Sequence, residues 1–213
     1  LVRRAKELGQ TAVAITDHGV MYGVVDFYNE CIRQGIRPIL GCEVYVAARS
    51  RHDKVHRQDS RYYHLVLLCE NNTGYLNLIK LVSAAWTEGF YIRPRIDREL
   101  LEQYHEGLIA LSACLAGAIP QYLMDESYDS AKAYALNLAR IFGPEHFYLE
   151  MQDHGIEAQR MVNQGILRLA RETGLPLVVT NDAHYLRKED AAMQDVLLCV
   201  QTGKTVDDPN RMR

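Results

Sequence analysis

Side chains that can bind metal ions follow several short apolar segments of this sequence, each at the point where the segment ends. The residues at these ends are His18, Glu43, Cys114, Asp182 and His184. His64 differs from them, because it lies near the start of its own apolar segment. In sheets of parallel strands, binding sites are built at the carboxyl ends of the strands, so we expect these groups to converge.

The six groups combine imidazole, carboxylate and one thiol. Such a ligand set suits zinc, manganese or iron(II), and it does not suit calcium or a closed site of four cysteines. Six ligands are too many for a single tetrahedral zinc ion, so they indicate two or three metal ions that share a bridging carboxylate. A cluster of this kind holds the attacking and leaving oxygens of a phosphate ester. The candidate catalytic residues are Glu43, Asp182 and His184.

Several of these residues also have an ordinary structural interpretation. Asp182 could cap a turn, and the Asp-His pair before Gly19 could begin a helix. His64 could be a hydrogen-bonded core histidine, and Cys114 could be a small buried apolar side chain. An unpaired carboxylate at Glu43 would be costly beside an apolar segment, which favours ligation there. The pattern of the whole set is therefore stronger than that of any one residue.

Further polar residues are candidates for the surroundings of the site. Asp17 is expected to orient a ligating histidine or to cap a helix, since ligating histidines usually have such a partner. Glu150 and His154 lie near the end of another strand-like segment and are expected to support the ligands from behind or to line the rim of the site. Arg93 and Arg95, in the segment IRPRID, could hold phosphate or DNA, or could lie in a solvated loop.

Apolar strand-like segments alternate with helical patterns along most of the chain. Strands are predicted at 12–17, 38–47, 63–70, 108–114, 146–152 and 175–182. This alternation predicts a mostly parallel sheet with helices on both faces. Six strands are one or two fewer than a closed barrel needs, and the chain opens on a helix, so we expect a single domain, 1–213, cut at both ends. The polar segment 49–61 is predicted to be an exposed loop.

Composition narrows the class of protein. A net charge of −3 over 213 residues argues against a surface that binds nucleic acid by bulk electrostatics. The five cysteines include no Cys-x-x-Cys pair, which is typical of a reducing cytosol and argues against a zinc ribbon. No apolar run approaches the length that spans a bilayer. We expect a soluble, cytoplasmic protein without a membrane partner.

Taken in order, these segments resemble the PHP domain (polymerase and histidinol phosphatase) of bacterial DNA polymerase III alpha subunits. The matching stretches are AVAITDHGVMYGVVDFY, PILGCEVYVA, YYHLVLL, GFYIRPRID, LIALSACLAG, FYLEMQDHG, LPLVVTNDAHYL and DVLLCVQTGKTVDDPNRM. TDHG, GCE and TNDAH are typical of PHP proteins in general, whereas IRPRID, LEMQDHG and LLCVQTGKT are typical of the polymerase type. The resemblance covers nearly the whole chain.

The resemblance implies a distorted seven-stranded, TIM-like β/α barrel with up to three divalent metals in a cleft at one end. It implies that Glu43 bridges two metals and that His64 and Cys114 bind one of these two. Asp182 and His184 would reach different metals. PHP proteins begin with a strand that ends in His-x-His, and this sequence has no such segment. We therefore expect the barrel to lack its first strand, and the site to be partly occupied and weakly active or inactive.

The resemblance also implies a function within a DNA-directed DNA polymerase, which is a nucleotidyltransferase. The domain would be a metal-dependent phosphoesterase acting as a 3′–5′ proofreading exonuclease, or else a catalytically silent domain that scaffolds a separate proofreading subunit. Expected partners are DNA, the proofreading subunit and the sliding clamp, and the exposed strand edge could support self-association. The polymerase-type segments disfavour a stand-alone histidinol phosphatase. The absence of a lysine at a strand end disfavours an amidohydrolase.

Overall fold

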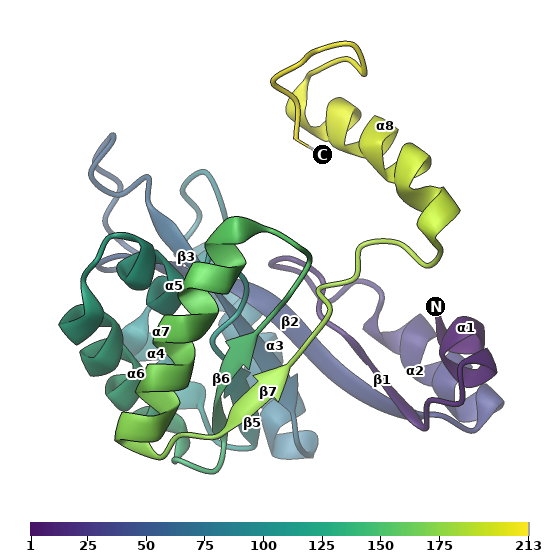
Figure 1. The fold of residues 1–213 in the computed structure, drawn as a ribbon. Helices are drawn as coiled ribbons and strands as arrows, with labels where there is room; N and C mark the ends of the chain where they lie inside the picture. Colours follow the sequence, from purple (N-terminus) through teal and green to yellow (C-terminus); the bar gives the residue numbers. More distant parts are fainter. Residues whose placement is uncertain (213) are drawn as a thin grey trace.

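The computed structural model describes residues 1–212 and contains a curled sheet of seven strands (Figure 1). The strands are β1 (Ala12–Ile15), β2 (Arg37–Ala47), β3 (Tyr62–Cys69), β4 (Arg95–Ile96), β5 (Leu108–Leu111), β6 (Phe147–Met151) and β7 (Leu177–Val179). They follow the order β1-β2-β3-β5-β6-β7, and β4 pairs with β2 outside this path. Among the described residues the sheet ends at β1 on one side and at β7 on the other, so it forms a half-barrel.

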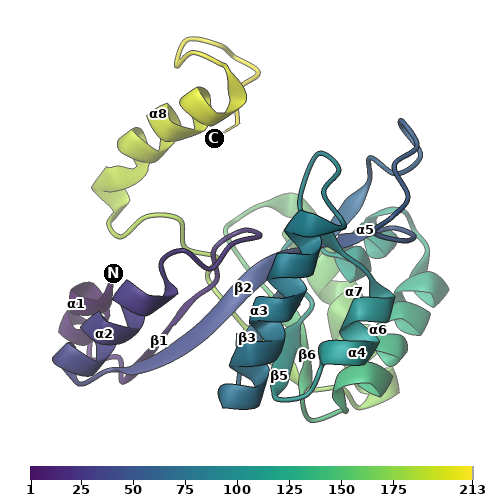
Figure 2. The same ribbon diagram turned by 180° about the vertical axis from the view of Figure 1, so that it is seen from behind.

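Helices cover the sheet unevenly. They are α1 (Val2–Glu7), α2 (Val24–Gln34), α3 (Asn72–Thr87), α4 (Arg98–Tyr104), α5 (Ala118–Met124), α6 (Tyr128–Phe142), α7 (Glu157–Thr173), the short 3-10 helix η1 (Lys188–Asp190) and α8 (Ala191–Thr202). Figures 1 and 2 show α3 to α7 gathered around the larger part of the sheet, with α1 and α2 beside β1. In both views α8 extends away from the rest of the domain. No helix among residues 1–212 is long and apolar enough to cross a membrane.

The sheet is mostly parallel, as predicted, but β3 runs against both of its neighbours. It pairs antiparallel with β2 and β5, while the remaining pairs are parallel. The physical reason is the connection from β2 to β3, which contains no crossover helix and returns the chain as a hairpin. The prediction of six strands is wrong by one. The additional strand is β4, only two residues long, in a segment that has no strand pattern.

The main hydrophobic core lies between the sheet and helices α3 to α7. Its most deeply buried side chains include Leu67, Leu78, Leu101, Phe147 and Leu149. In α7 the buried residues Val162, Ile166 and Leu169 recur at intervals of three and four, so one face of the helix packs inward. Each such side chain contributes about 1.5–3 kcal/mol on burial. This core gives the polar ends of the strands a rigid base.

Strand β7 lies at the edge of the sheet, and this corrects the interpretation of its apolar segment as a covered strand. Leu177 is 40% exposed and Val179 is 75% exposed. The run LPLVV has the composition of a strand buried on both faces. Among the described residues, however, β7 pairs with β6 alone. The segment that carries Asp182 and His184 therefore leaves from an exposed edge.

The segment 49–61 is a loop that is exposed over most of its length, as predicted, but two of its side chains are buried and anchor it. Arg51 is 8% exposed and Asp59 is 2% exposed. Arg95 is 1% exposed, and its guanidinium donates to the backbone carbonyls of Asp59, Arg51, Asp53 and Gly89. The prediction that Arg95 holds phosphate is wrong, because its guanidinium is buried and bonded to the backbone of two loops.

Candidate metal centre

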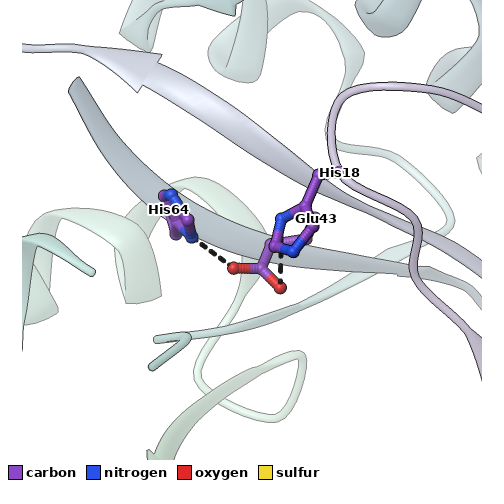
Figure 3. Close-up of side chains that lie close together, drawn as sticks. All are labelled: His18, Glu43 and His64. Carbon is purple, nitrogen blue, oxygen red and sulfur yellow. Dashed lines mark hydrogen bonds and ion pairs between the residues drawn. The ribbon is translucent and has the colours of Figure 1, made fainter. Parts of the chain in front are cut away.

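Three side chains from separate parts of the chain meet at one point (Figure 3). His64 Nδ1 is hydrogen-bonded to Oε1 of Glu43, and His18 Nδ1 lies 3.8 Å from Oε2 of the same carboxylate. One ligand atom from each residue lies within 4.8 Å of the others. Glu43 is only 5% exposed, so the structure places a buried carboxylate between two imidazoles.

The position of His18 follows from backbone pairing that continues beyond β1. The N–H of Glu43 donates to the Asp17 carbonyl at 3.1 Å, and the N–H of Gly19 donates to the Glu43 carbonyl at 2.9 Å. Gly19 has a φ of +66°, a conformation that glycine adopts without strain. The indole of Trp86 donates to the Gly19 carbonyl at 2.9 Å and holds the loop from outside. Asp17 thus contributes through its backbone carbonyl.

His64 reaches the site from the start of its strand because β3 is antiparallel to β2. Tyr45 pairs with His64 and Glu43 pairs with Val66, so Glu43 and His64 lie on the same face, one diagonal step apart. The amino-terminal end of an antiparallel strand lies beside the carboxyl end of its neighbour. The direction of β3 therefore explains why His64 departs from the sequence pattern of the other candidate ligands.

Cys114 joins the cluster from the turn that follows β5. Its Sγ lies 3.9 Å from Glu43 Oε1 and 3.8 Å from His64 Nδ1. The preceding residue, Ala113, has a φ of +65°, which turns the chain sharply at the end of the strand. The next turn is tied back to β3, because the N–H of His64 donates to the Ala116 carbonyl at 3.0 Å.

Electrostatics differ between the carboxylate and the thiol. Burial raises the pKa of Glu43, but the hydrogen bond from His64 and the charges of His64, His18 and His184 outweigh it and hold that pKa below 4.5. Burial, and then the negative charge of Glu43, raise the pKa of Cys114 to about 12. The carboxylate is therefore ready to bind a cation, whereas the thiol must release a proton when a metal ion binds.

His184 borders the cluster, and Asp182 lies beside His184. The rings of His184 and His18 are 5.7 Å apart between centroids. His184 Nδ1 lies 2.9 Å from the Asp182 carbonyl oxygen and 3.8 Å from Asp182 Oδ1. The side chain of His184 is 45% exposed. Asp182 has a φ of +46°, so the chain bends sharply after β7. The structure thus brings His184 near the other ligands from an open side.

The two residues predicted to support the ligands or to line the rim have different environments. Glu150 is 4% exposed and lies behind the turn of Cys114, where its Oε2 accepts the N–H of Ala113 at 2.9 Å. It is therefore a buried supporting residue and does not line the rim. His154 is exposed, and its Nε2 lies 2.6 Å from the Asn181 carbonyl oxygen. His154 thus links the loop after β6 to the segment after β7.

An aromatic and cationic surface lies beside the cluster. The Tyr45 ring centroid is 5.2 Å from that of His64, and the Arg93 guanidinium lies 5.7 Å from the Tyr45 centroid. Tyr62 stacks on His64 at 6.2 Å, and its hydrogen bond with Arg93 raises the pKa of that guanidinium. The two tyrosines were not predicted as site residues. The alternation of strand residues could have found Tyr45, which lies two positions after Glu43.

The donor set fits a divalent metal ion. Two imidazoles and one carboxylate have ligand atoms within 4.8 Å of one another, and the Cys114 thiol lies within 3.9 Å of Glu43 and His64. This mixture suits zinc, manganese or iron(II). Buried polar groups of this kind are costly unless they are paired, and both oxygens of Glu43 have a histidine partner, at His64 and at His18. The residues at this edge of the sheet therefore have the donor types and the spacing to hold a divalent metal ion.

Comparison with known proteins finds relatives over the whole chain. It is 48% identical over 214 residues to the DNA polymerase III subunit alpha of Treponema pallidum, and 48% identical over 204 residues to that of Thermus aquaticus. These matches cover 100% and 95% of this chain but 18% and 17% of the relatives, so the chain spans less than a fifth of their length. A solved structure from Bifidobacterium adolescentis, described as a candidate metal-dependent phosphoesterase, has a related fold. Its TM-score is 0.50 at 14% identity, over 92% of this chain and 88% of that one.

A family model adds the assignment of the domain itself. The model described as the PHP domain matches residues 1–154, which include strands β1 to β6. The matched region also contains His18, Glu43, His64 and Cys114, the four groups that converge at the carboxyl edge of the sheet. Sequence motifs, half-barrel fold and ligand geometry therefore agree, and the chain belongs to the PHP domain family.

Proposed function

We propose that residues 1–213 form one PHP domain of a DNA polymerase III alpha subunit. In that subunit the domain acts as a metal-dependent phosphoesterase with 3′–5′ exonuclease activity. The observation that supports this most is the buried Glu43 carboxylate, which lies between two imidazoles and 3.9 Å from the Cys114 thiol. Imidazole, carboxylate and thiol groups gathered from separate segments are the donors that zinc, manganese and iron(II) take. The 48% identity to polymerase alpha subunits supports the polymerase context.

The proposed site takes two or three divalent cations, with zinc, manganese and iron as the candidates. Glu43 would bridge two of them, His64 and Cys114 would hold one, and Asp182 and His184 would reach different ions. When bound, such cations lower the pKa of water and neutralise charge on a phosphate ester. The contribution of the protein is to hold these ligands on a rigid sheet edge, with Glu43 already ionised.

Arg93 is the proposed phosphate-binding residue of the site. Its guanidinium is exposed and lies over the Tyr45 ring, which in turn borders His64. An arginine held on an aromatic face presents a planar fork of donors to a phosphate. We propose that the terminal phosphodiester of a DNA 3′ end binds between Arg93 and the metal ligands. Tyr45 and Tyr62 would then border the terminal nucleotide.

The test combines metal analysis with a 3′-exonuclease assay of the whole polymerase on a 5′-labelled single-stranded oligonucleotide in the presence of manganese or zinc. Glu43→Gln is expected to reduce both bound metal and the rate of shortening by at least about 100-fold, because a ligand is lost from the site. Glu145→Gln is the matched control, since its side chain is 71% exposed and lies outside the cluster. Equal rates for wild type and Glu43→Gln would refute the proposal.

A second candidate function is a silent scaffolding domain that holds the proofreading subunit. Its support is the apolar surface of α8, where Met193 is 70% exposed, Leu197 is 61% exposed and Val200 is 77% exposed. Asp182→Asn in the whole polymerase separates the two functions. Loss of exonuclease activity with unchanged folding supports the phosphoesterase. A wild-type polymerase without any exonuclease activity, in which Asp182→Asn lowers only stability, supports the scaffold.

The proposed partners are DNA, the proofreading subunit and the sliding clamp, in the cytoplasm. Self-association is a further proposal, supported by the edge strands β1 and β7, which have unpaired outer sides among residues 1–212. An edge strand can pair with a second chain through its free N–H and C=O groups. Analytical ultracentrifugation would detect a dimer, and a monomer at high concentration would contradict this proposal.

A further inference from the structure

Glu150 is a buried carboxyl group that lies behind the metal centre and has no role among its ligands. It comes from β6, is 4% exposed, and faces the ends of the two neighbouring strands. Its Oε2 accepts the backbone N–H of Ala113 at 2.9 Å. Its Oε1 is hydrogen-bonded to the Thr180 hydroxyl and accepts the Gln152 amide at 3.3 Å. Both oxygens are therefore used by protein donors.

The hydrogen bond from its backbone N–H to Glu150 holds Ala113 in an unusual conformation. Ala113 is 2% exposed and has a φ of +65°, a left-handed conformation that is unfavourable for any residue with a Cβ. Its N–H lies away from the regular ladder, because the pairing of β5 with β6 ends near Ser112. The Ser112 hydroxyl there accepts the N–H of Glu150 at 2.8 Å. The next residue along the chain is Cys114, so the Ala113 backbone sets the direction of the thiol.

Glu150 also reaches the other side of the site. Thr180, its partner on the far side, directly follows β7 and precedes the bend that carries Asp182 and His184. Gln152 reinforces the contact, since its amide lies 3.3 Å from the Thr180 hydroxyl as well. One carboxyl group therefore connects the ends of β5, β6 and β7. Among residues 1–212, β7 is the edge strand and pairs only with β6.

We infer that Glu150 is a positioning residue, which holds the turn at Ala113 so that the Cys114 thiol faces Glu43 and His64. This inference rests on the proposed function, because it requires Cys114 to bind a metal ion. Glu150 is not a ligand itself, since its two oxygens are bonded to Ala113 and Thr180. Its effect on metal binding is transmitted through the backbone.

The test is titration of the full chain with cobalt(II), whose bond to a thiolate gives a charge-transfer absorption. Glu150→Ala is expected to weaken cobalt affinity about 10–100-fold, the usual effect of losing a partner of a metal ligand. It should also reduce the thiolate absorption per bound cobalt. Glu150→Gln keeps an acceptor for Ala113 and should retain most of both signals. Glu145→Ala is the exposed control, and circular dichroism verifies folding of each variant.

A second substitution tests whether Glu150 affects metal binding through the backbone of Ala113. Glycine adopts a φ of +65° without the cost that alanine has, so Ala113→Gly in the Glu150→Ala background should recover about fivefold or more of the lost affinity. A general loss of packing would not be rescued in this way. If Glu150→Ala does not fold, Glu150→Asp makes the same test, because it keeps the carboxylate but withdraws it from Ala113 by one methylene.

The outcomes separate this inference from the proposed function. Cys114→Ser removes the only thiol of the cluster, so the absorption must disappear in that variant. If wild type shows no thiolate absorption, Cys114 is not a ligand, and both the proposed ligand set and this inference fail. If wild type shows it and Glu150→Ala retains it with unchanged affinity, only the inference on Glu150 fails. Absence of any rescue by Ala113→Gly would also overturn it.

Discussion

Replacing Arg95 by methionine removes a buried guanidinium while keeping a long apolar stem in its place. In the wild type this group donates at 3.2 Å to Gly89, at 3.0 Å to Asp59, at 3.2 Å to Arg51 and at 2.8 Å to Asp53. All four acceptors are backbone carbonyls, and they belong to two loops that are far apart in the sequence. Arg95→Met is therefore expected to release both loops from the sheet.

The size of the effect follows from the number of carbonyls left without a donor. A buried acceptor without a partner costs about 1–3 kcal/mol. If water or loop movement satisfies two of the four, the remaining two cost about 2–6 kcal/mol. Removing a buried charge offsets part of this, because its desolvation is no longer required. We expect a loss of about 2–4 kcal/mol, which is a large share of the 5–15 kcal/mol that holds a typical domain folded.

Urea unfolding measures this loss, followed by the fluorescence of Trp86, the only tryptophan in the chain. Arg98→Met is the matched control, because Arg98 lies three residues away, is 62% exposed and pairs with Glu102 on the surface. Its unfolding midpoint should stay close to that of wild type. Arg95→Lys should recover only part of the loss, since an ammonium group lacks the planar fork. A midpoint for Arg95→Met equal to that of the control would refute the reasoning.

The remaining predictions concern the site and one close backbone contact. The pKa of Glu43 is held below 4.5, so its ionised form contributes stability above about pH 4.5 that is lost as pH falls through the lower folded value. The stability difference between metal-free wild type and Glu43→Gln should thus shrink as pH falls below about 4.5, and a constant difference in urea unfolding would contradict this. Trp86→Phe removes the donor to the Gly19 carbonyl and should lower the free energy of unfolding by about 1 kcal/mol, measured by urea unfolding with circular dichroism. Calorimetry should also show weaker manganese binding. Unchanged values would show that the indole does not hold this loop. Gly74→Ala would place a Cβ directly against the Gly107 carbonyl oxygen, too close for a van der Waals contact. This substitution should destabilise the fold by about 1–3 kcal/mol or more, and a wild-type melting temperature would count against it.

The α/β class and the candidate ligands could be predicted from the sequence because both depend on local patterns. In α7 the apolar residues Val162, Ile166 and Leu169 recur with the period of a helix, and these are among the residues that the fold buries. His18 and Cys114 follow short apolar strands, and chain direction alone places them at the carboxyl edge of a parallel sheet. The resemblance to PHP domains rests on the same local motifs, and the family comparison confirms it.

The direction of β3 is different, because a strand's alternation is the same whichever way its neighbours run. Only pairing with β2 brings His64 to Glu43, and that pairing depends on a hairpin across the loop at 49–61. The two arginines of IRPRID make the same point. Arg93 is exposed beside the site and Arg95 is buried under two loops, although their local sequence treats them alike.

The sequence by itself thus determined which chemistry this protein can hold and in which segments, since residue type and spacing are properties of the chain. Tertiary structure alone decided which of these side chains meet, which strand edge stays exposed, and which carboxyl group supports the site from behind. The physical reason is that burial and hydrogen-bond partners come from residues distant along the chain. Glu150 and Ala113 are 37 positions apart, yet one backbone hydrogen bond joins them.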